Sequence, residues 1–598
     1  MDILEDIFCC IVNGLWVALC FPGYLAYRIS ASGVEKTQSR ILFKVLKRNK
    51  NTAFGLKYNF DLIKTINDFQ NRIPISTFED YIAYLEEIKA GKKNVLTADR
   101  VLRLNPTSGS TSASKFIPFT RTLKKEFQRS IRPWVFNLYT RQKRLLLGKM
   151  YWSITPSTIT VNSKVRTKIP IGFGDDSDYF SIWEKIILKS LLIVPQEVNQ
   201  IQDIHTFRYV TLLFLISCKN LRFITIWNPM FLILILNNIP EWLPRLLSDL
   251  KNKSITPPGR ITYQLKSKLE RKLKVTSKRI EELEFIYERW KLDANIPIYR
   301  MIWPELGLIS CWADSNAQLF VTQLRKLFPD VEIQPKGLIA TEGFISFPFS
   351  SVNPEKEKNN FSNSNNLFSS GYLSVNSHFF EFMEIEQNNQ YNCNNRLKLA
   401  HEVEVGKKYF VVLTTSGGLY RYNLQDIVEV TGFSRKIPVV RFLGKYDYVS
   451  DITGEKLNAH HVEKVLRSLF AKYKMYPVFY MLAPEKFENN TVAYTLFIKI
   501  TDYRKEALIS LAEDLDNCLS ENFHYMYCRK LKQLDRLRLF VIDSEVSALE
   551  QYLFHKTNHN KEKLGNIKVS VLDKSVGWTK VFSGALIHAT EIEAEMSQ

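Results

Sequence analysis

Hydrophobic and polar positions follow two kinds of spacing along this chain, and together they predict a mixed α/β fold. Residues 76–79, Ser-Thr-Phe-Glu, have the form of a capping box, and the helical spacing after them predicts a helix that ends at Gly91. A longer helical pattern covers residues 124–138, after which short strand-like runs such as 221–227 alternate with amphipathic helices. This alternation indicates an α/β layout.

Strand-like segments become frequent after residue 378, and a new series of elements starts near residue 445. The predicted strands before that point are 379–385, 409–414, 427–431 and 439–443. Beyond it, a helix at 460–473, a strand at 492–500 and a helix at 504–519 indicate a separate α+β domain. We therefore expect a large N-terminal domain, residues 1–443, and a small C-terminal domain, residues 444–598.

Two long apolar stretches raise the question of membrane segments. The first, residues 7–27, contains Asn13 and Pro22 and follows an acidic start that is unlike a secretory signal. It predicts a buried or interfacial helix, and a peripheral membrane contact through it is an open alternative. The second, residues 209–239, is interrupted by polar residues and a proline, which favours helix, short strand and helix in a core. We predict no transmembrane segment.

Composition narrows the class of protein. The 598 residues include 81 Lys and Arg against 61 Asp and Glu, a formal net charge of +20, so an anionic partner has to be considered. The densest basic stretch, residues 266–279, has leucines at helical spacing and predicts a solvated helix face, and no nucleic-acid reader motif accompanies it. The eight cysteines form neither a metal-ligand pattern nor a dense disulfide framework, so we expect a cytoplasmic protein. Asn- and Ser-rich tracts within residues 350–396 predict mobile surface loops.

The most distinctive polar segment is the hydroxyl-rich loop from Thr107 to Lys115. Its six hydroxyls, one glycine and one lysine offer closely spaced donors and a movable positive charge, which suit a polyphosphate. The spacing differs from a Walker A loop, because a single glycine stands among hydroxyls and the lysine follows six positions later. A polar surface turn with a chance lysine is the alternative interpretation.

Three other segments carry candidate chemistry. Glu342 ends an apolar strand beside a glycine, where a carboxylate is suited to holding a metal ion against phosphate oxygens. Asp426 follows a polar turn and can accept hydrogen bonds from both hydroxyls of a ribose. Lys568 lies near the C terminus on a loop that contains Gly565. Taken singly, a strand-end turn, an exposed turn aspartate and an exposed lysine explain these residues as well.

The order of these segments resembles that of the acyl-adenylate-forming superfamily. Within it the chain resembles the auxin-responsive acyl-acid amido synthetases, the Gretchen Hagen family, and most closely its bacterial-type members, from about Tyr58 to Leu572. The segments that carry the resemblance are 72–75, 91–97, 107–118, 151–153, 227–232, 303–304 with Leu308 and Trp312, 337–343, 420–422, 444–447 and 454–456.

The resemblance implies both a fold and an activity. The large domain is expected to hold β-sheets flanked by helices, with a distorted β-barrel portion, and the small α+β domain to be mobile. The implied activity is adenylation of a carboxylic acid by ATP with Mg²⁺, release of pyrophosphate, and transfer of the acyl group to an amine, for which the resemblance implies an amino acid. An acyl-CoA or carrier-thiol ligase, and a non-catalytic ligand-binding descendant, are the alternatives.

The resemblance also assigns roles to residues. Lys568 and Lys115 match the catalytic lysines, Glu342 the metal ligand, and Asp447 the hinge. The residues that match ATP and AMP contacts are Ser108, Gly109, Ser110, Thr111, Ser112, Lys115, Ala340, Thr341, Glu342, Tyr422, Asp426 and Lys445. The candidate acyl-binding residues are Tyr151, Trp152, Trp312 and Phe344.

Four departures from the family pattern bear on the site. Ser110 replaces a threonine and keeps its hydroxyl, and Lys445 replaces an arginine and loses the fork that grips two oxygens. Leu424-Gln425 replaces Thr-Gly before Asp426, so we expect Asn423 to take the left-handed conformation that eases this turn. Val569-Ser570 replaces Pro-Pro after Lys568. Lys574 and Lys580 are therefore the alternatives to Lys568.

Overall fold

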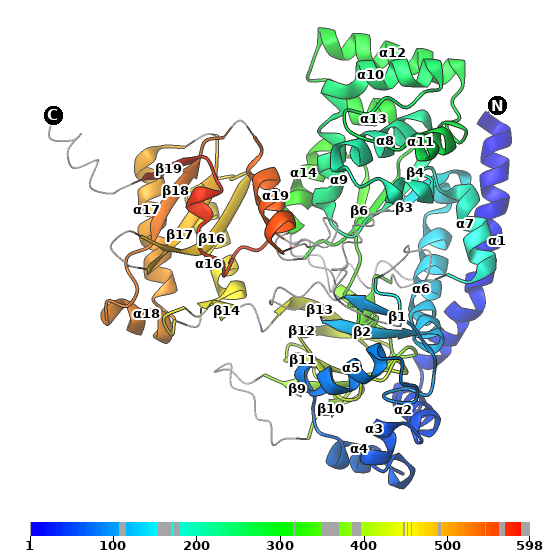
Figure 1. Ribbon diagram of the computed structural model, residues 1–598, viewed down its shortest axis with the longest axis vertical. Coiled ribbons are helices and arrows are strands. Elements are labelled where there is room, and N and C mark those ends of the chain that lie inside the picture. The colour runs from blue at the N-terminus through cyan, green and yellow to red at the C-terminus, as the bar shows by residue number, and fades with distance from the viewer. Residues whose placement is uncertain are drawn as a thin grey trace. The chain divides into compact units, whose positions relative to one another are not determined.

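The computed structural model divides the chain into two compact units, Met1–Phe442 and Leu443–Gln598. Each unit has its own sheets and its own helices (Figure 1). The structure describes residues 2–106, 115–152, 169–172, 180–314, 317–349, 370–385, 396–445, 449–450, 452–455, 457–487, 492–501, 503–544, 546–560 and 569–587.

The first unit opens with a long apolar helix, α1 (Asp2–Ser30), which lies alongside α6 (Arg121–Arg141) (Figure 1). By length and composition α1 could cross a membrane, yet one of its sides is buried in the unit. Thr120 caps α6 by accepting a 3.1 Å hydrogen bond from the backbone N–H of Leu123. The elements between these two helices are α2 (Val34–Asn49), α3 (Ala53–Lys57), η1 (Phe60–Leu62), α4 (Ile66–Arg72), η2 (Glu79–Tyr81) and α5 (Ile82–Lys89).

The capping box predicted at residues 76–79 does not form. The helix there begins as a 3₁₀ turn at Glu79, and Asp80 accepts a 2.8 Å hydrogen bond from the N–H of Thr77. The Ser76 hydroxyl instead donates to the Tyr420 carbonyl at 2.9 Å, and Ser76 bridges to Tyr422 as a strand would. The prediction was wrong because the Ser76 hydroxyl bonds to a segment far away in sequence and not to the helix that follows it.

A parallel sheet forms one half of the first unit, with strand order β3-β4-β5-β6. The apolar stretch 209–239 falls in α8, β4, α9 and the start of α10, which agrees with the predicted helix, short strand and helix. The strands are β3 (Lys149–Trp152), β4 (Leu221–Thr225), β5 (Leu308–Cys311) and β6 (Glu332–Pro335). The surrounding helices are η3 (Lys143–Leu147), α7 (Ile182–Leu191), η5 (Gln196–Gln200), α8 (Ile204–Ser217), α9 (Pro229–Leu236), α10 (Ile239–Asn252), α11 (Tyr263–Glu270), α12 (Ser277–Leu292), α13 (Ile298–Ile302) and α14 (Ala317–Leu327).

The basic stretch 266–279 is not one continuous solvated face. It is divided between α11 and α12, and Arg279 at its end is buried. The Arg279 guanidinium donates to the carbonyls of Ile216, at 3.0 Å, and Ile302, at 2.7 Å. This arginine therefore ties α12 to the ends of two other helices, which the charge pattern alone did not predict.

An antiparallel sheet forms the other half of the first unit, with strand order β10-β9-β11-β12-β13-β8-β7. Beside it, β1 (Val101–Pro106) and β2 (Phe116–Thr120) form a hairpin whose connection is the hydroxyl-rich loop. The strands of the sheet are β7 (Ser346–Phe347), β8 (Ser370–Leu373), β9 (Phe379–Glu384), β10 (Lys398–Leu399), β11 (Lys408–Thr414), β12 (Tyr422–Ser434) and β13 (Ile437–Lys445).

The second unit contains a four-stranded sheet in the order β16-β17-β18-β19, in which β17 and β18 are parallel and the other pairs antiparallel. Its helices and strands match the predicted helix, strand and helix closely at α16, β17 and α17. The elements are β14 (Val449–Ser450), β15 (Leu457–Asn458), α16 (Ala459–Lys472), β16 (Phe479–Lys486), β17 (Val492–Lys499), α17 (Lys505–Leu519), α18 (Phe523–Lys530), β18 (Arg538–Ile542), α19 (Ala548–Asn560), η7 (Trp578–Lys580) and β19 (Gly584–Ile587).

Candidate active site

The carboxyl ends of the parallel strands bring large polar and aromatic side chains to one edge of the sheet. Trp152 is the last residue of β3, Trp227 follows β4, and Lys336 follows β6 directly. Parallel strands end at the same edge, and ligands of α/β sheets bind there. The sequence of this unit therefore places an ammonium group and two indoles where a small molecule would bind.

Lys336 is held among three tryptophans. Its Nζ lies 5.2 Å from the ring centroid of Trp134, 6.0 Å from that of Trp152 and 5.3 Å from that of Trp227. The same ammonium donates a hydrogen bond to the Thr225 hydroxyl on β4. Cation–π attraction of this kind stabilises a charge that has left bulk water. Lys336 is accordingly a buried cation on an otherwise apolar surface.

A small cavity opens against this cluster, with a volume of about 40 Å³. It has room for a few water molecules only, so a larger ligand would enter by rotating the lining side chains. Trp152 and Phe344, both predicted to bind the acyl group, line it. The full lining is Phe127, Ile131, Trp134, Trp152, Phe180, Trp227, Lys336, Ile339 and Phe344.

The other two predicted acyl-binding residues lie elsewhere. Tyr151 is fully buried and, as the neighbour of Trp152 on β3, projects to the opposite face of the sheet. Trp312 packs edge-on against Phe442 at a ring distance of 5.4 Å, and its Nε1 donates to the Asp314 carbonyl. Neither residue is among those that line the cavity.

A tight turn connects the cavity to Glu342. The N–H of Ala340 donates to the Gly343 carbonyl at 3.0 Å, which closes the turn over Thr341 and Glu342. A side chain at Gly343 would come within 2.7 Å of Leu413 and 3.1 Å of the His378 ring, so only glycine fits without movement. The next residue, Phe344, reaches the cavity, and Glu342 therefore lies two residues from its wall.

Tyr422, at the start of β12, lies near the two predicted acidic residues, Glu342 and Asp426. Burial raises the pKa of the Tyr422 phenol well above its ordinary value, and the negative charges of Glu342, Glu79 and Asp426 raise it further. Such an effect requires these carboxylates to lie close to one hydroxyl. Glu342 and Asp426 are themselves buried, so Asp426 is not an exposed turn residue.

Lys115 lies near Glu79, one of the carboxylates that act on Tyr422. Burial raises the pKa of Glu79, but hydrogen bonds from its own backbone N–H and from the Thr77 hydroxyl, together with the Lys115 cation, bring it below the ordinary value. The Lys115 Nζ also lies 5.5 Å from the ring centroid of Phe78. Lys115, Glu342 and Asp426 thus belong to one neighbourhood of the first unit, although they are far apart in sequence.

The turn before Asp426 is a bulge in β12. Phe410 faces Ile427 and Val412 faces Asn423 across the β11–β12 ladder, so one residue of β11 opposes three residues of β12. Gln425 takes the left-handed conformation, with φ of 59°, and its N–H donates to the Asn423 side chain at 2.8 Å. The predicted left-handed residue, Asn423, was the wrong one: it caps the turn with its side chain.

The Tyr-Arg-Tyr sequence before this bulge is anchored to other segments of the first unit through its arginine. The buried Arg421 guanidinium lies 3.2 Å from Glu381 and donates to the carbonyls of Gln70 and Ile73. Burial raises the pKa of the Glu381 carboxyl, and the Arg421 charge opposes that rise. These contacts lock the start of β12 to the segment that leads into Glu79.

Several predicted site residues lie elsewhere in the chain. Lys445 ends β13, and Lys574 and Lys580, both exposed, belong to the second unit. Within the described residues, no group of three or more His, Cys, Asp or Glu side chains could hold a metal ion without other ligands. The predicted residues that lie outside the described ranges are Ser108, Gly109, Ser110, Thr111, Ser112, Asp447 and Lys568.

Sequence reasoning missed Lys336, Trp134 and the buried pair of Glu126 and His378. Lys336 could have been predicted, because it directly follows a strand of the alternating α/β segment, at the edge where ligands bind. Trp134 lies inside the helix α6, where an aromatic residue is ordinarily part of the core. His378 gave no signal, since its partner is 252 residues away.

Models of known families match most of the first unit. The GH3 family N-terminal domain matches residues 29–333, and the GH3 family central domain matches residues 371–445. The chain belongs to the GH3 family. This is the Gretchen Hagen family of the predicted resemblance, and the predicted family is confirmed. The bacterial-type subgroup stays a prediction.

Named GH3 enzymes and a solved GH3 structure match most of this chain. The indole-3-acetic acid-amido synthetase GH3.4 of Arabidopsis thaliana is 22% identical over 456 residues, 73% of this chain and 71% of that protein. The jasmonoyl–L-amino acid synthetase JAR4 of Nicotiana attenuata is 22% identical over 537 residues, 86% of this chain and 88% of that protein. The structure of the AtGH3.15 acyl acid amido synthetase in complex with 2,4-DB matches with a TM-score of 0.75 at 16% identity, over 94% of this chain and 95% of that chain.

Two further predictions are confirmed by membership in the GH3 family. The fold is the mixed α/β fold of the GH3 structures. The enzyme class is an amide-forming ligase, because the curated GH3 relatives are amido synthetases.

Proposed function

We propose that this chain is an ATP-dependent synthetase that joins a carboxylic acid to an amino acid through an acyl adenylate. One observation carries the proposal: the charges of Glu342 and Asp426 both raise the pKa of the buried Tyr422 phenol, and the turn that contains Glu342 leads into Phe344, which lines a cavity with a buried lysine. A nucleotide and an acid can meet at such a junction. The acids and amino acids in the names of the relatives support this class of substrate.

The acid would lie in the cavity with its carboxylate toward Lys336. A buried ammonium attracts an anion strongly, because little water competes with the pair. The tryptophans and phenylalanines around it would pack against an aromatic or aliphatic body. Indole-3-acetic acid in the name of one relative, and 2,4-DB in a matched structure, are acids of that kind.

The nucleotide would lie across the turn and the hairpin. Asp426 would accept hydrogen bonds from the ribose hydroxyls, while Lys115 and the hydroxyl-rich loop would hold the phosphates. Glu342 fits a Mg²⁺ ion, since Mg²⁺ in nucleotide sites is bound by one or two carboxylates together with phosphate oxygens. A site made by one buried carboxylate and the substrate agrees with the absence of a larger acidic cluster among the described residues.

Adenylation requires positive charge close to the phosphates. A carboxylate oxygen attacks the α-phosphorus, the bond to the bridging oxygen breaks, and pyrophosphate leaves, so negative charge accumulates at one point. Lys115 and Lys568 are placed by the proposal to neutralise it. The neutral amine of an amino acid then attacks the acyl carbonyl and displaces AMP, which yields the amide.

Purified protein with ATP and Mg²⁺ would be given panels of carboxylic acids, each with mixed amino acids, with coenzyme A, or with neither. Amino-acid-dependent AMP release, with the amide found by mass spectrometry, is the expected result. Release stimulated only by coenzyme A would favour the thiol ligase. Failure of folded protein to bind ATP in calorimetry would favour the non-catalytic descendant.

Lys336→Met tests the position of the acid. It should raise the KM for the acid at least about tenfold, because the loss of a charged partner costs roughly 1.5–3 kcal/mol, while the KM for ATP stays near that of the wild type. Lys336→Arg, which keeps the charge, is the matched control. Equal increases in both KM values would contradict this arrangement.

A further inference from the structure

The exposed side of α1 is apolar along its whole length. Chain segment 7–27 contains no charged residue, and its exposed side chains are apolar, most of them large. At 3.6 residues per turn these positions span roughly 160° of the helix surface and about 40 Å of its length. The exposed large residues of α1 are Ile3, Leu4, Ile7, Phe8, Ile11, Leu15, Leu19, Phe21, Leu25 and Ile29.

The opposite side of α1 is fixed to the first unit. Asn13 donates from its side chain to the carbonyls of Leu146, at 2.9 Å, and Gly148, at 3.0 Å. Near the C-terminal end of the helix, the Tyr27 hydroxyl donates to the Leu373 carbonyl at 3.0 Å. A helix held along one side can lie flat on a surface, but it cannot cross a bilayer without breaking these contacts.

A neighbouring helix also exposes large apolar side chains. In α7, which packs beside α1, Trp183 is 73% exposed and Ile186 is 56% exposed. Tryptophan is enriched at the boundary between lipid and water, because its ring is apolar and its N–H is polar. Two helices that pack against each other therefore both expose large apolar side chains.

Positive charge follows directly after this surface. The chain turns at Ser32-Gly33 into α2, whose exposed face carries Lys36, Arg40, Lys44 and Lys47 at helical spacing. The acidic residues nearest in sequence are Glu35 in the first turn of α2, and Asp2, Glu5 and Asp6 at the start of α1. Glu5 is already paired with Lys149 at 2.7 Å, and Asp6 accepts from Asn220.

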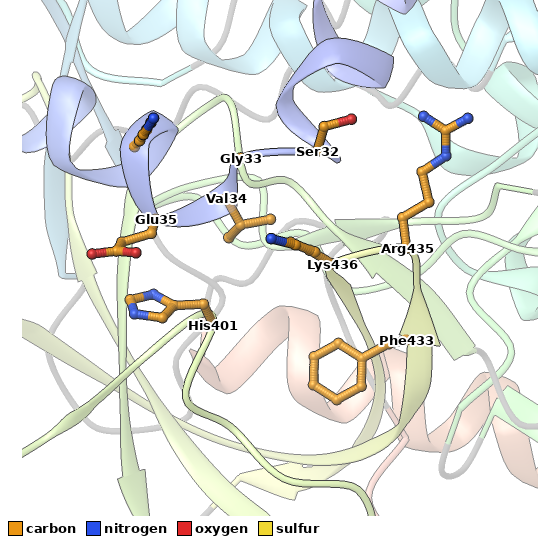
Figure 2. Close-up of a pocket in the computed structure, with 9 residues that line it drawn as sticks. Ser32, Gly33, Val34, Glu35, His401, Phe433, Arg435 and Lys436 are labelled. Carbon is orange, nitrogen blue, oxygen red and sulfur yellow. The ribbon is translucent and has the colours of Figure 1, made fainter.

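A basic pocket of about 680 Å³ lies at the corner between α1 and α2. The hairpin tip between β12 and β13 closes it, and the N–H of Lys436 donates to the Ala31 carbonyl at the end of α1. Figure 2 shows Lys436 reaching toward Val34, with the Phe433 ring below it and Glu35 beside His401. Lys36, Arg435 and Lys436 against the single carboxylate of Glu35 give this pocket a positive balance.

We propose that α1 docks the protein on an anionic membrane surface, with the apolar side of α1 in the boundary layer and α2 and the corner pocket against lipid phosphates. The breadth of the apolar surface, its exposed tryptophan and the adjoining cations are the features of an interfacial helix. The net charge of +20 adds long-range attraction to such a surface. The inference is independent of the reaction catalysed.

Vesicle flotation of the full chain tests this surface. Wild type should float with vesicles of three parts phosphatidylcholine to one part phosphatidylserine, and less with phosphatidylcholine alone or in high salt. Ile11→Gln/Leu15→Gln/Leu19→Gln should reduce the bound fraction at least about tenfold. The control Leu56→Gln/Leu292→Gln/Val405→Gln changes apolar residues outside α1 that are at least as exposed, and it should float like the wild type.

A second pair of variants tests the charge. Lys36→Gln/Arg40→Gln/Lys44→Gln should weaken flotation on the anionic vesicles, whereas Lys251→Gln/Lys268→Gln/Lys291→Gln, on other helices, should not. Absence of flotation by folded wild type, or equal flotation of the α1 variant, would overturn the proposal. A wild-type dimer that the α1 variant turns into a monomer, without vesicle binding, would show that a second copy covers α1. Resistance to alkaline carbonate extraction would show that α1 spans the bilayer instead.

Discussion

The His378 Nδ1 lies 3.1 Å from the Glu126 carboxylate, and the other ring nitrogen, Nε2, accepts a 3.0 Å hydrogen bond from the backbone N–H of Phe344. Since Nε2 accepts, the proton is on Nδ1 and points to Glu126. Both side chains are buried. The pair therefore fixes the residue at which the Glu342 turn enters the cavity.

His378→Leu should destabilise the protein and displace this turn. The Phe344 N–H and the Glu126 carboxylate would both lose a partner inside the core, a loss of roughly 1–3 kcal/mol in the free energy of unfolding for each. We also expect the KM for the acid to rise. Urea unfolding measures the loss of stability, and pyrophosphate exchange measures the KM. His378→Gln, which can still accept from Phe344, should retain more of both. A stable His378→Leu enzyme with an unchanged KM would contradict this role.

Gln425→Gly should stabilise the fold. The left-handed conformation costs a residue with a side chain about 1–2 kcal/mol, and glycine removes that strain while adding freedom to the unfolded chain. The expected net gain in the free energy of unfolding is roughly 0.5–1 kcal/mol. Gln425→Ala keeps the strain and serves as the control. If glycine and alanine have the same effect, the bulge is not strained at Gln425.

Arg421→Met should be far more damaging than its replacement together with its partner. It leaves Glu381 buried without its cation, which costs about 3–5 kcal/mol. In Arg421→Met/Glu381→Leu no charge remains buried, so much of the stability should return. Denaturant unfolding of the single and double variants measures the difference. A double variant less stable than Arg421→Met would show that the two residues contribute independently.

Glu184 should make part of the stability depend on pH. Burial raises the pKa of its carboxyl, but hydrogen bonds from Ser181 and the nearby Arg132 bring it below the ordinary value of 4.5. A carboxyl with a lowered pKa in the folded state stabilises the protein above the pKa of the unfolded state, and this stabilisation is lost as the pH falls through the folded value. Glu184→Gln should therefore cost roughly 1–2 kcal/mol at pH 7 and progressively less below about pH 4.5.

Unfolding of wild type and Glu184→Gln across this pH range measures the difference. The matched control is Glu241→Gln, which changes an exposed carboxyl in the first turn of α10. A Glu184→Gln difference that stays constant with pH would mean that the lost interaction does not involve the charge.

The sequence predicted what depends on local spacing. The strands around residues 409–414 and 492–500, and the helices near 124–138 and 460–473, lie within a few residues of their predicted bounds. The spacing of apolar residues depends on neighbours along the chain, so a single sequence is enough to predict these elements. The family resemblance then indicated which polar segments belong to one site.

What the sequence missed depends on distant partners. Ser76 looked like a helix cap but hydrogen-bonds to Tyr420, and Arg279 looked solvated but reaches two carbonyls of other helices. Gln425 rather than Asn423 is left-handed because β11 sets the register of the bulge. In each case the competing contact comes from a segment that local pattern does not contain.

The three tryptophans around Lys336 give the enzyme a built-in optical reporter. Indole emission responds to nearby charge and to rotation of the ring, and an acid that enters the cavity changes both. Ligands could therefore be screened by intrinsic fluorescence before any turnover is known, with Trp134, Trp152 and Trp227 as the responding rings.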